Sequence, residues 1–235
     1  MKKNLLVTTA LVAAFMTSNA LADEYIRNQE QLNNIDTSLA SIKFDNTNGK
    51  LDAMEEALTL NDNLELNGQV TLHDQVTLTG DKTLTVNGWL TQTASGSNVS
   101  GVDVVVNEGG LTLGNDLTVG DMTIGDEADI ALYNIGSDAS DSLEKVLNVT
   151  EGSVLYFGGT NEIRDSGQST TKGNTLTINA DNALVTFDTK DLNKNGALTL
   201  GSDVTINGKA TLHTKTSVTG GKNLTVNGWL TQSAS

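Results

Sequence analysis

The 235-residue sequence contains no cysteine and no proline, and aromatic residues make up only 4% of it. Without cysteine the chain has no disulfide bonds. Two explanations for the absence of cysteine stay open. An exported chain must remain unfolded if it is to cross a second membrane, or the fold is long and repetitive and needs no cross-links. The absence of proline suits a chain that consists mostly of β-ladder, because proline removes a ladder donor. Scarce aromatics suit a narrow core of Leu, Val and Ile.

Basic residues are also scarce. The sequence has 14 Lys and Arg against 29 Asp and Glu, a formal net charge of −15. This balance disfavours binding to nucleic acid or to an anionic membrane surface, since both carry negative charge.

The N-terminus has the pattern of a secretory signal peptide. Lys2 and Lys3 precede an apolar run from Leu5 to Met16, and small residues flank Leu21. The run is shorter than the roughly 20 residues that span a bilayer, which favours cleavage after Ala22 over anchoring, and no other stretch is apolar enough to cross a membrane. We therefore predict a signal peptide over 1–22 and export of the chain, to the cell surface, the outer membrane or the extracellular medium. The exported part would carry 12 basic and 29 acidic residues, because both leader charges are lysines (14 − 2 = 12), for a net charge of −17.

A duplication organises the rest of the chain. The segment 58–95 recurs at 198–235 without a gap, and 22 of the 38 paired positions are identical. Such a long duplication is typical of repeat architectures, in which each unit buries its apolar face against the next one. The first copy continues into GSNVSGVDVVV, whereas the sequence ends at Ser235. We therefore expect it to be truncated within a repeating array.

Each copy consists of very short apolar–polar–apolar segments separated by Asn, Asp and Gly. Alternation of this kind predicts short strands with one buried and one exposed face, and the intervening residues are those that turns prefer. In the first copy the apolar pairs are Leu58/Leu60, Leu64/Leu66, Val70/Leu72, Val76/Leu78 and Leu84/Val86.

Strands as short as these cannot sustain hairpins, but three of them could form one coil of a stack. The fold class predicted is all-β, a parallel β-helix (β-solenoid) over 44–235 and right-handed by preference. An antiparallel sandwich is the rival, although it needs longer strands. The spacing from Leu64 to Leu84 (84 − 64 = 20) predicts a coil of about 20 residues. The offset between the copies (198 − 58 = 140) would then equal seven coils and return equivalent residues to the same face.

Two segments depart from the strand pattern. Apolar residues over 23–43 recur at helical spacing, which predicts a short capping helix over the first coil. The residues concerned are Tyr25, Leu32, Ile35, Leu39 and Ile42. Asp141 and Glu144 have the spacing of a helix start, so Ser140–Leu147 is interpreted as a short helical excursion from the stack.

The signal peptide, the Leu-Thr-Leu and Val-Thr-Leu strands, the Asn/Gly turns and the acidic balance together resemble the passenger region of bacterial autotransporter adhesins. This resemblance covers 58–235. It implies a right-handed parallel β-helix of the pectin-lyase type, of which this chain would be an N-terminal fragment. It also implies export through a C-terminal translocator barrel outside the fragment.

Few residues suggest a binding site. Asp191, Asn193 and Asn195 fit the first half of a calcium loop, but the twelfth position is Ser202 rather than glutamate, so an Asn-rich turn is the simpler interpretation and calcium the only cofactor considered. The two histidines, His73 and His213, are interpreted as exposed turn residues.

Tryptophan and acidic residues leave two alternatives open. Trp89 and Trp229 could stack on a sugar or pack over a corner of a coil. The acids could converge as in a polysaccharide-active enzyme, or be scattered over turns; they are Asp121, Asp126, Glu127 and Asp129.

No catalytic residue is predicted. The favoured function is a structural and adhesive protein at the cell surface, whose partners are host or bacterial surface molecules, glycans or copies of itself. The alternative is a lyase or hydrolase acting on polysaccharides from the same fold.

Overall fold

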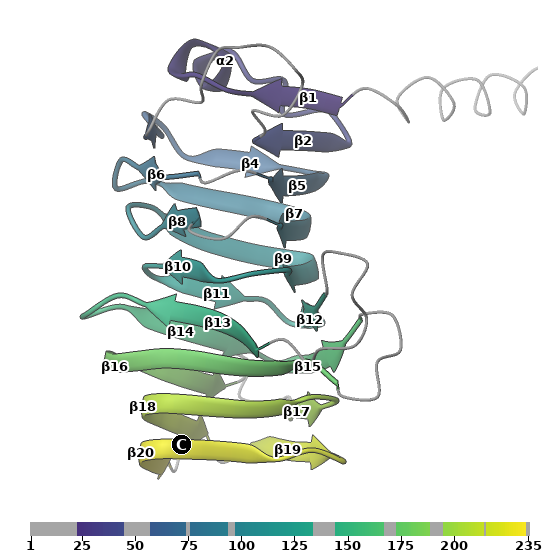
Figure 1. Cartoon of the computed structure of the whole chain (residues 1–235), viewed down its shortest axis with the longest axis vertical. Coiled ribbons are helices and arrows are strands. Elements are labelled where there is room, and N and C mark those ends of the chain that lie inside the picture. Colours follow the sequence, from purple (N-terminus) through teal and green to yellow (C-terminus); the bar gives the residue numbers. More distant parts are fainter. Residues whose placement is uncertain are drawn as a thin grey trace, which may run out of the picture.

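The computed structural model forms a tall stack of coils, with the first strands at one end and β20 at the other (Figure 1). It describes residues 23–44, 57–73, 76–93, 97–133, 144–166, 173–188, 195–213 and 215–233. Every ladder pairing between the strands of these residues is parallel, and each strand pairs with strands one coil before or after it. This confirms the parallel solenoid and excludes the antiparallel sandwich for the described part. The handedness stays a prediction.

Each coil has three sides, which we name in the order in which the chain visits them. The first side contains β3 (Leu58–Thr59), β6 (Leu78–Thr79), β8 (Ser97–Val99), β10 (Leu117–Val119), β13 (Glu144–Val149) and the first parts of β16 (Thr175–Asp188), β18 (Asp203–His213) and β20 (Leu224–Ser233). The second side contains β4 (Leu64–Leu66), the first parts of β7 (Thr83–Gln92) and β9 (Asp103–Leu113), β11 (Met122–Ile124), β14 (Val154–Gly158) and the later parts of β16, β18 and β20. The third side contains β1 (Asp23–Ile26), β2 (Ser41–Phe44), β5 (Gln69–Leu72), the later parts of β7 and β9, β12 (Asp129–Leu132), β15 (Thr160–Asp165), β17 (Gly196–Leu200) and β19 (Thr216–Gly220).

The core is a column of aliphatic side chains enclosed by the three sides. Inward residues alternate with outward ones along the strands, as in β7, where Leu84, Val86 and Leu90 are almost fully buried. Three phenylalanine rings of the described residues join the column: Phe44 is fully buried, and Phe157 stacks on Phe187 of the next coil, with ring centroids 4.7 Å apart. Apart from these rings, the core consists mostly of the Leu, Val and Ile residues that the strand pattern placed inside.

The predicted coil length is confirmed at the start of the stack. Leu64 pairs with Leu84, and Val70 pairs with Leu90. The central coils are longer, because Met122 pairs with Leu155. Short coils return at the end, where Ile206 pairs with Val226.

The expectation that the two copies occupy the same face is wrong. The ladder that starts at Leu64 on the second side passes one coil at a time through Leu84, Val104, Met122, Leu155 and Val185 and arrives at Ala210. Its duplicate, Val204, lies on the first side and pairs with Leu176. Since the central coils are longer than the first ones, the offset between the copies is no longer a whole number of coils. The second copy is consequently displaced by one side.

Asparagine ladders explain why the same sequence fits at two different corners. Asn87 donates its side-chain amide to Asn67 and accepts from Asn107, at 2.9 and 2.8 Å, between the second and third sides. In the second copy Asn227 donates to Asn207 at 3.0 Å, but between the first and second sides. The Asn-Gly bend thus forms the same inter-coil bonds at either corner, so the sides of the coil are interchangeable for this motif.

The cap prediction needs correction. The helix α2 spans only Gln29–Asn33, and the segments before and after it are the strands β1 and β2, which pair with each other in parallel. Ile42 is buried as part of an alternating strand pattern, so its helical spacing from Leu32 and Ile35 is coincidental. A short capping helix is nevertheless present, and the side chain of Asn28 caps its N-terminus by accepting from the Gln31 amide at 2.9 Å.

The predicted excursion over Ser140–Leu147 is also corrected where the structure describes it. Residues 144–149 form strand β13, which pairs with β10 and β16, and its inward residues are Lys145, Leu147 and Val149. Ladder bonds on both edges outweigh a weak capping signal. The proposed helix start at Asp141 lies outside the described residues, as do the predicted signal peptide 1–22 and the calcium candidates Asp191 and Asn193.

Candidate functional site: a pocket beneath the cap helix

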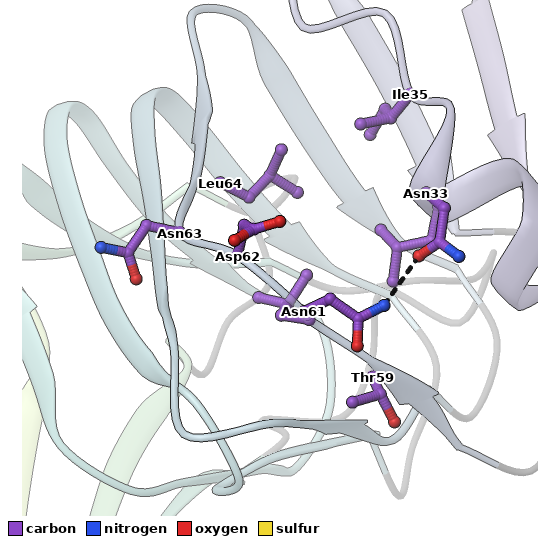
Figure 2. A pocket seen from close by; sticks show the side chains of 9 residues that line it. Asn33, Ile35, Thr59, Asn61, Asp62, Asn63 and Leu64 are labelled. Carbon is purple, nitrogen blue, oxygen red and sulfur yellow. Dashed lines mark hydrogen bonds between the residues drawn. The ribbon is translucent and has the colours of Figure 1, made fainter.

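A cavity of about 250 Å³ opens between α2 and the turn that joins β3 to β4 (Figure 2). Its apolar part comes from both elements, and its polar part comes from the Asn61-Asp62-Asn63 turn and from Asn33 at the end of α2. The residues that line it are Leu32, Asn33, Ile35, Thr59, Leu60, Asn61, Asp62, Asn63 and Leu64. The pocket thus combines an aliphatic floor with a rim of amides and one carboxylate.

Two contacts hold the helix against the first coil. Gln29 pairs with β3 as a further strand residue would: its side-chain amide donates to the Thr59 carbonyl oxygen and its Oε1 accepts from the Thr59 amide, both at 2.7 Å. Asn61 donates to Asn33 Oδ1 at 3.0 Å, which joins the turn to the end of α2 (Figure 2). The two Gln29 bonds satisfy the backbone groups of Thr59 at the exposed edge of β3, where pairing with a strand of another chain would otherwise be favourable.

Several rim groups are not used by the described structure. The Oδ1 atom of Asn61 and the Nδ2 atom of Asn33 form no hydrogen bond to a described residue, and neither does the carboxylate of Asp62. Asn63 accepts from the Thr83 amide at 3.0 Å and retains its own amide hydrogens. The rim therefore offers both donors and acceptors. In the sequence this stretch has the pattern of a turn and nothing more, because nothing there shows that α2 packs beside it.

Three of the four acidic residues considered for catalysis accept hydrogen bonds from the backbone of the following coil. Asp121 accepts from the Val154 amide at 2.7 Å, Asp126 from the Thr160 amide at 2.9 Å and Asp129 from the Glu162 amide at 3.1 Å. Glu127 is exposed, in a left-handed turn with φ of 64°. The three aspartates therefore serve as additional hydrogen-bond acceptors between one coil and the next, and two of them, Asp126 and Asp129, bind amides of the same strand, β15.

The tryptophans and histidines occupy separate places. The Trp89 ring lies against Gly109 at a corner, and the guanidinium carbon of Arg164 lies 5.6 Å from its centroid. Trp229 belongs to β20 and is 76% exposed. His73 contacts Thr93 at 2.9 Å, whereas His213 lies 3.7 Å from Asp188, near the other end of the stack.

Of the three calcium candidates the structure describes only Asn195. Asn195 is exposed just before β17. Within the described ranges no three His, Cys, Asp or Glu side chains gather as metal ligands.

One ionisable group that was not predicted from the sequence lies inside the core. Lys145 is 2% exposed, and its ammonium group donates to the Gly114 carbonyl oxygen at 2.8 Å. Burial lowers the pKa of Lys145, while the charges of Asp116 and Asp165 act in the opposite direction. The alternating pattern of β13 would have placed this lysine inside, but the helical interpretation of the segment concealed it.

Lys145 makes the stability of the chain depend on pH in the alkaline range. Between the lowered pKa of the folded state and the ordinary lysine value of 10.5, the unfolded chain binds more protons, so the free energy of unfolding rises with pH. Lys145→Met should remove this rise and leave stability near neutral pH unchanged or higher, because the buried charge is gone. Urea unfolding at a series of pH values, from neutral into the alkaline range, measures how the free energy of unfolding changes with pH. The exposed Lys209→Met is the control, and an identical pH slope in both variants would contradict the prediction.

Comparison with known proteins gives no further identification: no family model, no curated protein and no solved structure matches this chain. The fold and the site define a parallel β-solenoid with a helical cap and a small polar pocket beneath it. No helix in the described part is long and apolar enough to span a bilayer.

Proposed function

We propose that this chain is a structural and adhesive protein of the cell surface, exported by its N-terminal leader and similar in role to an autotransporter passenger region. The parallel stack supports the proposal because it sets outward polar side chains in columns at the spacing of adjacent strands. On the third side, Thr71, Thr91 and Thr112 follow one another in three successive coils. A wide surface of this kind binds through many weak contacts, whose combined strength comes from repetition.

The observation that carries the proposal is the engagement of the acidic side chains. Asp121, Asp126 and Asp129 each hold a backbone amide of the next coil. A retaining or inverting glycosidase needs two carboxyl groups facing one another across the scissile bond, about 5–9.5 Å apart. Carboxylates that accept hydrogen bonds from backbone amides stabilise the contact between coils. This favours adhesion over polysaccharide cleavage.

Display of the chain on a non-aggregating bacterial host tests this function. We expect the displaying cells to aggregate or to attach to glycan-coated or cell-coated surfaces, whereas cells displaying only the leader and residues 23–44 do not. Attachment without release of reducing sugar from soluble polysaccharides supports adhesion. Release of sugar without any attachment would reject it in favour of the enzyme.

A further inference from the structure

The cap pocket has the chemistry of a saccharide site. Its apolar lining consists of Leu32 and Leu60, which are 5% and 3% exposed, and of the partly buried Ile35 and Leu64. Ile35 and Leu64 are labelled in Figure 2. Sugar rings present aliphatic C–H faces together with hydroxyl groups around their edge, so they need apolar and polar surfaces side by side. The cavity of about 250 Å³ provides both.

The polar groups of the rim match hydroxyl groups in particular. A hydroxyl both donates and accepts, and the rim presents acceptors in Asp62 and Asn61 Oδ1 beside the amide donors of Asn33 and Asn63. Asn61 and Asn33 are already fixed by their mutual hydrogen bond of 3.0 Å. Binding therefore immobilises few additional side chains, which lowers its entropic cost.

The charge of the site restricts the ligand further. Asp62 is the acidic group that lines the pocket, and no basic residue is among the described residues that line it. The chain as a whole has a net charge of −15. An anionic sugar such as a uronic acid is repelled by both, so the ligand is a neutral sugar.

We propose that the cap pocket binds one neutral sugar residue of a glycan, with Asp62 accepting hydrogen bonds from its hydroxyl groups. This inference rests on the proposed adhesive function and names the ligand class of one site within it. The duplicated segment offers an internal comparison. Asn61, Asp62 and Asn63 correspond there to Gly201, Ser202 and Asp203, and Ser202 is 1% exposed. In the described part of the chain the helix α2 packs beside the first turn and not beside the second, so we assign the site to the first copy alone.

Saturation-transfer NMR with the purified chain tests the proposal. The probes are the methyl glycosides of N-acetylglucosamine and mannose, with glucuronic acid as the anionic probe. We expect saturation transfer to at least one neutral probe and none to glucuronic acid. Asp62→Asn should weaken binding of the neutral probe about tenfold, because a charge-assisted hydrogen bond is replaced by a neutral one.

Two further variants make the result specific. Asp181→Asn removes the same charge at an exposed position in β16 and should bind as the unmodified chain does. Ile35→Trp narrows the cavity from the segment that follows α2 and should abolish binding. Absence of transfer to both neutral probes overturns the proposal, and so does binding that Asp62→Asn and Ile35→Trp leave unchanged. If cells displaying the chain still attach in that case, the pocket proposal fails while the adhesive function stands.

Discussion

Replacing Phe187 by alanine is expected to lower the free energy of unfolding by about 3–5 kcal/mol. Phe187 is 2% exposed and stacks on Phe157 of the preceding coil, with ring planes 22° apart. The substitution removes a large buried side chain at a position where neighbouring coils, held by ladder bonds on both edges of β16, cannot collapse into the space. Urea unfolding followed by circular dichroism measures the loss.

A control and a double-mutant cycle separate the ring contact from general loss of apolar area. Tyr133→Ala removes an aromatic ring that is 42% exposed and should change stability by less than about 0.5 kcal/mol. Combining Phe187→Ala with Phe157→Ala should give a coupling of about 0.5–1.5 kcal/mol, the contribution of the stacked pair beyond its area. Additive single effects would mean that the two rings do not stabilise each other.

Local periodicity is sufficient to predict the coil where the sequence is most regular. Leu64 and Leu84 could be aligned from the sequence because each lies in the same short apolar–polar–apolar segment, and strands of this length pair only with neighbouring coils. Over the whole duplication the prediction is wrong because it assumes a constant coil length. Ladder pairing instead tolerates long connections at the corners, as the pairing of Met122 with Leu155 shows.

The pocket could not be predicted from the sequence for a different reason. Asp62 and its neighbours have an ordinary turn composition, and only the packing of α2 against this turn makes a cavity there. That packing depends on Gln29, whose side chain pairs with the edge of the distant strand β3. A contact of this kind has no periodic signal. Lys145, in contrast, could have been placed in the core from the alternation of β13 alone.

Gly110→Ala should be among the most damaging small substitutions in the chain. Gly110 pairs with Trp89 on one edge and with Asp129 on the other, and its φ is +144°. A methyl group there would overlap the Asp129 carbonyl oxygen, so the backbone of the next coil must move. We expect a loss of about 3 kcal/mol or more in the free energy of unfolding, from conformational strain of about 1–2 kcal/mol and a steric conflict of similar size.

Gly152→Ala isolates the two contributions. Gly152 also has a positive φ, +81°, but an added methyl group would meet no described atom within 4 Å. Its substitution should therefore cost only the strain, about 1–2 kcal/mol. The difference between the two variants in the free energy of unfolding, measured with urea, gives the free-energy cost of the steric conflict between adjacent coils at Gly110. Equal losses would show that the corner at Gly110 relaxes freely, and that the close spacing of the coils does not depend on glycine at this position.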